Sequence, residues 1–327
     1  MNKLHIAAGA SVGIIALGVI ATDHITDTMA QNLIQENVIE SYRDKGYEVR
    51  AGKISGSIDG MAHISNIAIR KDGQEVLLDG VRASNGYQVV EKAIITSDNN
   101  PGDSLTISNI TTEGIKYKDG ERQLEDNVSI TIDSIDIDVE KLNERFSDSP
   151  DLNPFRDIGF AANWLYDPQA NTTDLNVAIS INDQAGLNLE AGLSNVSEKL
   201  LTAAPANTMD QEQALSLMNS IGFRSASIIV WNETLLETLI QTTPAFKNKS
   251  FSSVKARIVS NIQRMAYPDR YKAPVLNFIG DARELKVSLN PDEPITSEEF
   301  VHMGKALMIG QTSMDRIGDT IGFNMSN

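Results

Sequence analysis

The stretch VSITIDSIDIDVEKL, residues 128–142, changes the phase of its apolar alternation halfway along. Its apolar residues first occupy one set of alternate positions and then the other: Val128, Ile130 and Ile132, followed by Ile135, Ile137 and Val139. Side chains of a strand point to opposite faces with a period of two, so one extra residue is needed to keep both sets on one face. The stretch therefore predicts a long strand with a bulge near Ser134.

The phase change also places three carboxylates in line on the polar side of this strand: Asp136, Asp138 and Glu140. A cation site needs oxygen ligands that converge from a loop or from several elements, whereas one strand offers only a row. We therefore interpret the row as a solvated face that discourages pairing with other chains.

Turn signals and short apolar-alternating runs fill the sequence before this strand, from Gly52 to Gly120. This spacing is typical of a meander of short antiparallel strands. The sequence also contains a weak internal repeat, because Ile64-Ser65-Asn66-Ile67 recurs as Ile107-Ser108-Asn109-Ile110. This repeat fits repeated hairpins of one kind.

A linker, Ser147 to Asp157, follows the long strand, and three more alternating strands are legible after it. Their apolar positions are Phe160, Ala162, Trp164 and Tyr166; Leu175, Val177, Ile179 and Ile181; and Leu187, Leu189, Ala191 and Leu193. Short turn-like segments join them, which predicts hairpins.

Helices enter in the last third of the chain, interleaved with two strands. We expect helices at residues 208–222, 232–244, 250–267 and 273–282, the last with Pro274 in its first turn, and strands at 223–231 and 284–291. A final helix begins at the capping box Thr296-Ser297-Glu298-Glu299.

The predicted fold class is α+β, with an N-terminal membrane helix, a largely antiparallel curved sheet meander, and helices concentrated in the C-terminal third. We expect residues 1–24 to be a signal anchor or signal peptide and 25–146 to form an amphipathic helix and a β-rich region. Residues 147–157 are the linker, and 158–327 form a second meander with the helices. The sequence leaves open whether the β-rich part is one domain or two.

The N-terminal segment MNKLHIAAGASVGIIALGVIATDH indicates the compartment. Lys3 precedes an uncharged run from Ile6 to Ala21, which is typical of an export signal or an anchor, since ~20 residues cross a bilayer. We favour an uncleaved single-pass anchor in the inner membrane, because helical apolar spacing continues from Ile25 to Ile39; cleavage after Ala21 is the alternative. The apolar anchor residues are Ile6, Val12, Ile14, Ile15, Leu17, Val19 and Ile20. The positive-inside tendency then makes the bulk of the chain periplasmic.

Composition excludes several function classes. The 327-residue chain has a formal net charge of −16, which disfavours nucleic acid and anionic headgroups as partners, so lipid contact is expected through apolar surface. Cysteine is absent, which removes thiolate nucleophiles, thiolate zinc sites and disulfides. We expect no cofactor.

No catalytic motif emerges from the sequence. His63 and His302 lie far apart and form no metal-binding pattern, and neither a dinucleotide fingerprint nor a phosphate loop occurs. We therefore predict no catalytic or metal-binding residues and a protein that is not an enzyme; an envelope hydrolase is the least favoured alternative.

Trp164 and Trp231 both lie in apolar alternating runs. This position fits core packing or, alternatively, an apolar ligand groove. The residues of such a groove would be Ile130, Ile132, Trp164, Leu175, Val177, Ile179 and Trp231.

The layout resembles the AsmA-like and YdgA-like envelope proteins of Gram-negative bacteria. At the N-terminal end the resemblance lies in the anchor followed by KGYEVRAGKISGSIDGMAHISNIAIRKDGQEVLLDGV, residues 45–81, and at the C-terminal end in NETLLETLIQ and VLNFIGDARELKVSLNPDEPIT. The resemblance implies a β-rich periplasmic protein anchored in the inner membrane, and in some members a part in moving envelope lipids. It implies no catalytic residues.

These observations together lead to two hypotheses. The first is a non-enzymatic envelope protein that binds or helps to transport lipid, or maintains the envelope, through an apolar sheet face. The second is a scaffold whose helical C-terminal part recruits an envelope protein complex.

Overall fold

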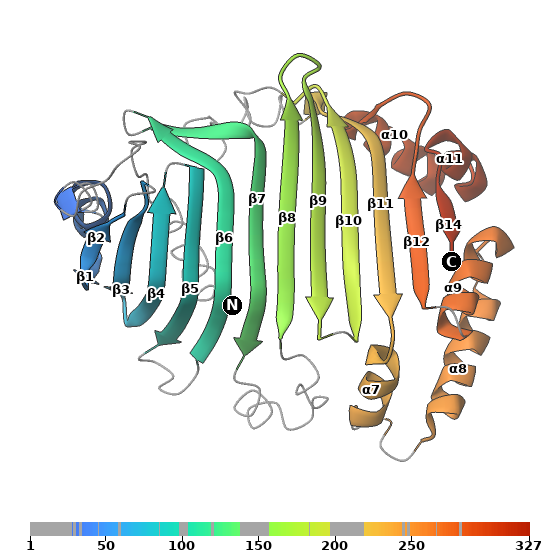
Figure 1. Ribbon diagram of the computed structural model, residues 1–327. Coiled ribbons are helices and arrows are strands. Elements are labelled where there is room, and N and C mark those ends of the chain that lie inside the picture. The colour runs from blue at the N-terminus through green and yellow to red at the C-terminus, as the bar shows by residue number, and fades with distance from the viewer. Residues whose placement is uncertain are drawn as a thin grey trace. The chain divides into compact units, whose positions relative to one another are not determined.

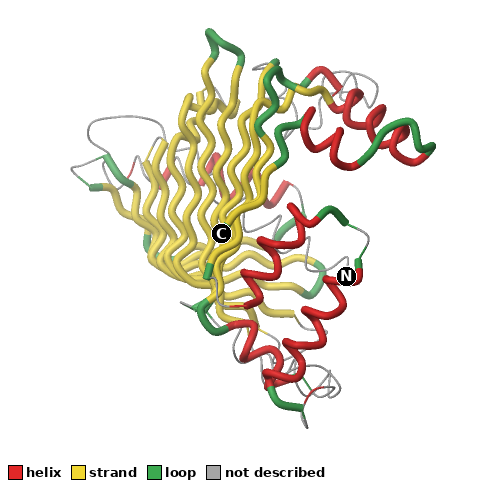
Figure 2. The backbone as a smooth tube through the Cα atoms, turned by 90° about the vertical axis from the view of Figure 1, so that its right-hand side faces the viewer, coloured by secondary structure: helices red, strands yellow, loops and turns green. Residues whose placement is uncertain are grey.

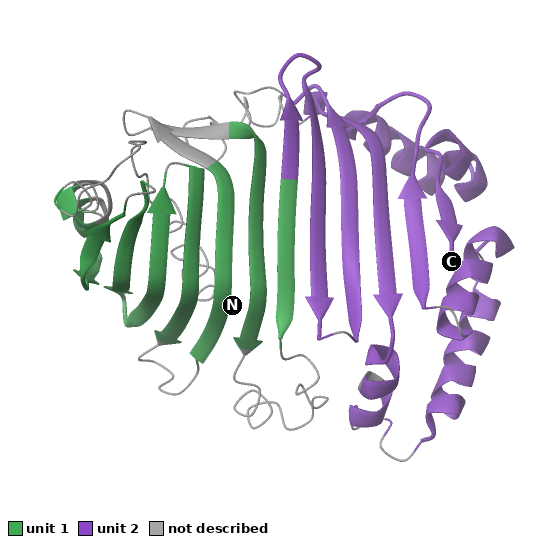
Figure 3. Cartoon of the chain, in the orientation of Figure 1, with its two compact units in different colours: residues 1–144, 156–163 green, residues 145–155, 164–327 purple. Residues whose placement is uncertain are grey.

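The computed structural model describes residues 28, 31–32, 35–44, 46–57, 60–84, 86–97, 104–118, 121–137, 157–182, 184–196, 219–243, 246, 249–265, 267–280 and 283–327. The chain forms two compact units (Figure 3). Unit 1 comprises residues 1–144 and 156–163, and unit 2 comprises residues 145–155 and 164–327. Strand β8 (Ile158–Asp167) contributes its first part to unit 1 and its second part to unit 2.

Unit 1 is an antiparallel meander preceded by short helical turns (Figure 1). Its elements are η1 (Gln35–Glu40), α3 (Ser41–Asp44), β1 (Glu48–Ala51), β2 (Ile54–Gly56), β3 (Ala62–Lys71), β4 (Gln74–Ser84), β5 (Gly86–Ser97), β6 (Ser104–Lys118) and β7 (Glu121–Ile137). The order in the sheet is β1-β3-β4-β5-β6-β7, and β2 also pairs with β3. From β3 onward consecutive strands pair as neighbours, as the turn signals predicted, whereas β1 and β2 both pair with β3.

The predicted change of phase in β7 is present, and every strand from β3 to β7 shares it. At the same level of the sheet each strand has two apolar residues separated by two residues that are polar or, at Gly80 of β4, glycine. One inner row is Ile64, Val81, Val90, Ile110 and Ile132, and the next is Ile67, Leu78, Ala93, Ile107 and Ile135. Members of both rows belong to or pack against the same core.

The phase change differs from the predicted bulge in one respect. Pairing stays one-to-one through this level, with Ile132 opposite Ile110 and Ile135 opposite Ile107, so β7 does not place two residues against one. The neighbouring strand changes phase at the same level, and Asn109 donates a hydrogen bond from Nδ2 to Asp133 Oδ2 at 3.0 Å. A bulge needs an unaltered partner strand, and here the partner is altered in the same way.

The inner face of unit 1 is deeply buried. Ile64 and Leu78 expose 1% and 2% of their surface, and Ile39 of η1 packs into the same core. Burial of this inner face is the main source of stability for unit 1, at about 25 cal/mol for each Å² of apolar surface removed from water.

Unit 2 is also an antiparallel meander, with helices toward its C-terminal end. Its elements are β9 (Thr172–Ile181), β10 (Ala185–Ser194), β11 (Gly222–Asn232), α7 (Leu235–Thr242), α8 (Phe251–Arg264), α9 (Asp269–Gly280), β12 (Glu284–Leu289), β13 (Ile295–Thr296), α10 (Ser297–Met308), α11 (Met314–Thr320) and β14 (Asn324–Ser326). The order is β9-β10-β11-β12-β14, with β13 beside β11. Figure 2 shows the strands and helices from the side.

Local sequence signals set several helix boundaries in unit 2. Thr296 caps α10 through the predicted capping box with Glu299, and Ser250 caps α8. The prediction for α9 was wrong at its start: the helix begins at Asp269, so Pro274 lies inside it. Proline lacks the N–H for one helical hydrogen bond, which is why the sequence suggested a later start. The helix predicted at 208–222 falls largely outside the described residues.

The antiparallel, curved meander with helices toward the C-terminus confirms the coarse fold prediction. The predicted N-terminal membrane helix, residues 1–24, lies outside the described residues. The predicted boundaries at 25–146, 147–157 and 158–327 stay predictions.

Candidate functional site

One face of the β9 to β12 sheet in unit 2 is apolar. Leu187 of β10 lies opposite Ile179 of β9 and Val230 of β11, and the next level repeats this pattern with Leu189 at its centre. We call this surface the aliphatic face; it consists of Leu175, Val177, Ile179, Leu187, Leu189, Ala191, Ala226, Ile228, Val230, Leu285, Val287 and Leu289.

The aliphatic face is open compared with the inner face of unit 1. All of its residues are half-buried or exposed, and Ile179 and Ile228 expose 37% and 38% of their surface. The aliphatic side chains on the inner face of unit 1, such as Ile64 and Leu78, are almost fully buried by comparison. Exposed apolar area on this scale is typical of a surface that binds something apolar.

Helices contact the sheet of unit 2 near its last strands. Helix α9 packs against β12 and β14, and α10 packs against β13. Phe300 of α10 meets Phe223 of β11 edge to face, with ring centroids 5.5 Å apart, beside Leu193. In Figure 1 the helices gather around β11, β12 and β14, away from β9. Helix α10 therefore packs against the end of the sheet at Phe223 and Leu193.

The opposite face of the same strands is mostly polar. Ser180, Asn188 and Glu190 alternate with aliphatic-face residues, and Arg224 forms an ion pair with Asp174 at 2.6 Å. Trp231 also belongs to this face, where its indole lies over Gly186, the residue paired with it on β10.

The structure brings together only some of the predicted groove residues. Leu175, Val177 and Ile179 share the aliphatic face. Trp231 does not join them, because an odd number of positions separates it from Ile228 and Val230 of that face. Ile130 and Ile132 belong to the inner side of unit 1, and half-buried Trp164 lies in β8. The predicted groove is therefore not one continuous lining.

Sequence reasoning missed the centre of the aliphatic face. Leu187, Leu189, Ile228, Val230 and Val287 were assigned to strands without being assigned to the groove. Their alternation carried the same signal as that of β9, and the short hairpin loop would have fixed the register between β9 and β10.

The residues that the structure describes contain no group of three His, Asp or Glu side chains placed to hold a metal ion. His302 lies 3.5 Å from Glu298 on exposed α10, and His63 lies on β3. Exposed Asp136 occupies the predicted acidic row, whereas Asp138 and Glu140 lie outside the described residues.

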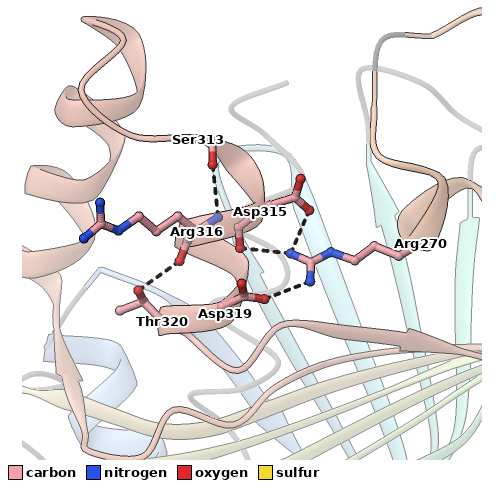
Figure 4. Close-up of polar contacts among 6 residues, drawn as sticks. All are labelled: Arg270, Ser313, Asp315, Arg316, Asp319 and Thr320. Atoms are coloured by element: carbon pink, nitrogen blue, oxygen red, sulfur yellow. Dashed lines mark hydrogen bonds and ion pairs between the residues drawn. The ribbon is translucent and has the colours of Figure 1, made fainter.

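Among the residues that the structure describes, Arg270 and Glu299 have shifted pKa values, and both belong to contacts of the C-terminal helices. Hydrogen bonding to Asp319 raises the pKa of Arg270, whose guanidinium also contacts Asp315 at 2.8 Å (Figure 4). Hydrogen bonds from the backbone and side chain of Thr296 lower the pKa of Glu299. Both groups are exposed parts of helix contacts, so their shifts indicate local structure rather than an acid–base pair.

Among the described helices, none combines the length and apolar character needed to span a bilayer. The predicted anchor residues, from Ile6 to Ile20, lie outside the described residues.

A family model described as "Uncharacterized protein" matches residues 178–323, a range that holds most of the aliphatic face and all the helices from α7 to α11. No curated protein matches the chain.

Proposed function

We propose that this chain is a non-enzymatic protein of the cell envelope, anchored in the inner membrane by its N-terminal segment, that binds lipid on the aliphatic face of unit 2. The observation that carries the proposal is the half-buried to exposed state of that face, with Ile179 and Ile228 at its most open positions. The proposal agrees with the resemblance to AsmA-like and YdgA-like proteins.

The chemistry of the aliphatic face suits acyl chains. Its rows consist of Leu, Ile, Val and Ala, and no charged side chain belongs to it. Burial of each methylene of a ligand against such a surface contributes about 0.8 kcal/mol. The aliphatic face has no charged member and belongs to a chain with a net charge of −16, so this face gains little from anionic headgroups and apolar contact is its favourable mode.

Native mass spectrometry with organic extraction tests this proposal on the full chain. The variant Ile179→Glu/Ile228→Glu places carboxylates on two exposed positions of the aliphatic face, and Ser180→Glu places one on the opposite side of β9. We expect the double variant to lose lipid that the wild type and Ser180→Glu retain. Equal lipid content in all three would refute binding on this face.

A separate measurement tests the anchor. We expect the full chain to stay in the membrane pellet after alkaline carbonate extraction, because a spanning helix resists it. Release of the chain into the supernatant would contradict the proposed anchor while leaving lipid binding by unit 2 open to its own test.

One observation favours the second hypothesis, a scaffold for an envelope complex. The end of α10 and the start of α11 expose Met308 by 81%, Ile309 by 68% and Met314 by 43%. Exposed Met and Ile side chains at one tip are typical of contacts with a partner protein. If the scaffold hypothesis holds, Met308→Lys/Ile309→Lys should abolish co-purification of that partner without changing bound lipid.

A further inference from the structure

A depression of about 440 Å³ lies on the outward face of unit 1, across β1, β3, β4 and β5. Its floor is the paired row Ala68, Leu77 and Ile94, in which Leu77 is 39% exposed. Arg50 of β1 and Lys92 of β5 lie at its two sides. The depression thus combines an apolar floor with cationic walls.

The shared change of phase in unit 1 shapes one border of the depression. Asn66, Asp79 and Lys92 are paired across β3, β4 and β5 at the level where each strand changes phase. The next outward row beyond them is the apolar floor. A polar rim therefore runs directly beside an apolar surface.

The two cations are not neutralised by ion pairs in the described part of the chain. No described carboxylate lies within 4.0 Å of the Arg50 guanidinium or the Lys92 ammonium. The Asp79 carboxylate accepts a hydrogen bond from the Gly80 N–H at 3.0 Å instead. With Arg50, Lys92 and one carboxylate, the lining carries a net positive charge in a chain whose net charge is −16.

The spacing suits one small head group. β1 and β5 are separated by β3 and β4, which puts their backbones three strand spacings apart, or about 14 Å. Arg50 and Lys92 both have long side chains, and both residues line the depression. A volume of this size lies at the lower end of the range for small-molecule sites.

We propose that this depression binds the anionic head of a single-chain amphiphile, an aliphatic carboxylate, between Arg50 and Lys92. The first methylenes of its chain lie over Ala68, Leu77 and Ile94. Charge-assisted hydrogen bonds to the guanidinium and the ammonium select the carboxylate, and the floor accepts the chain. This site is additional to the aliphatic face of unit 2, which has no charged member.

Photocrosslinking of the full chain in nanodiscs of zwitterionic lipid tests the proposal. The probes are a diazirine-bearing decanoate and the matching decanol, and mass spectrometry of peptides maps the labelled residues. We expect decanoate to label the depression in β3, β4 and β5, and Arg50→Gln/Lys92→Gln to lower this labelling about tenfold, since two charge-assisted contacts are lost. Lys305→Gln/Arg316→Gln, with the same change of charge on exposed helices of unit 2, should leave it unchanged.

Salt gives a second test on the wild-type chain. We expect 0.5 M NaCl to weaken labelling of the depression by decanoate and to leave labelling by decanol unchanged, because salt screens exposed charges. Equal labelling of the depression by both probes, indifference to the Arg50→Gln/Lys92→Gln variant, or no labelling there would overturn the proposal. Labelling of β9 to β11 by both probes reports on the aliphatic face separately, so failure of one site is distinguishable from failure of the other.

Discussion

Gly80 and Asn109 lie at the same level of the unit 1 sheet, on β4 and β6, and both have left-handed backbone conformations, with φ of 61° and 51°. Glu91 of β5 lies between them. Glycine adopts this conformation freely and asparagine does so more readily than most residues. These two positions therefore fix the change of phase on alternate strands.

Replacing Gly80 with alanine should destabilise unit 1 by about 1–2 kcal/mol, because an L side chain is strained at this φ. A Cβ at Gly80 would also overlap the carboxyl group of Glu91, although that exposed side chain is able to move aside. Gly80→Asn should cost less, since asparagine tolerates the left-handed region. Hydrogen exchange of the β4 and β5 peptides measures the difference; an alanine variant as stable as the wild type would show that this conformation is not required.

Thr112→Val should stabilise unit 1 by about 1 kcal/mol. Thr112 is 1% exposed on the inner face, and its hydroxyl has no hydrogen-bond partner among the described residues. Burial of an unpaired hydroxyl is costly, and valine keeps the shape without it. Thr111→Val, on the outward side of the same strand, is the matched control and should change little. A less stable Thr112→Val variant would reveal a partner for the hydroxyl.

Arg270→Lys should loosen α11 against α9. The guanidinium reaches Asp319 through Nη1 and both the carboxylate and the backbone carbonyl of Asp315 through Nη2. A lysine ammonium does not reproduce this fork. We expect faster hydrogen exchange in α11 and no such change for Arg316→Lys, whose backbone atoms, rather than its side chain, make the hydrogen bonds in Figure 4. Equal exchange in both variants would mean that packing alone holds α11.

Acid should open the start of α10. The pKa of Glu299 is lowered in the folded chain from its ordinary 4.5, so the unfolded helix binds the proton first. The contribution of the capping box is therefore complete above pH 4.5 and is lost as the pH falls through the lower folded pKa. Glu299→Gln should remove this component of the acid response of the α10 peptide, measured by hydrogen exchange. If Glu299→Gln left the acid response of the α10 peptide unchanged, another titratable group would be responsible for that response.

Much of the meander was predictable because alternation and turn residues act locally. The sequence repeat was visible in two tetrads, Ile64-Ser65-Asn66-Ile67 and Ile107-Ser108-Asn109-Ile110. Their alignment with Leu78-Asp79-Gly80-Val81 was not visible, because it depends on the register between strands. The same dependence explains why a single bulge was predicted near Ser134 instead of a change of phase across the sheet.

The site was harder to predict than the strands. In β11 the run Ile228-Ile229-Val230-Trp231 is apolar on both faces, so alternation does not tell which side Trp231 occupies. The degree of burial of Leu189 depends on what packs over the sheet, which pattern alone does not specify. Pro274 misled the boundary of α9 because its helix-breaking tendency is overridden in the folded chain.

The most direct test of the central claim places a photoreactive benzoylphenylalanine at Ile179 in one variant and at Ser180 in another, in cells that make the full chain. These neighbouring positions are both exposed but belong to opposite faces of β9. If the aliphatic face binds lipid, mass spectrometry should find lipid adducts at position 179 and few at position 180. Equal adducts at both positions, or none at 179, would contradict lipid binding on the aliphatic face.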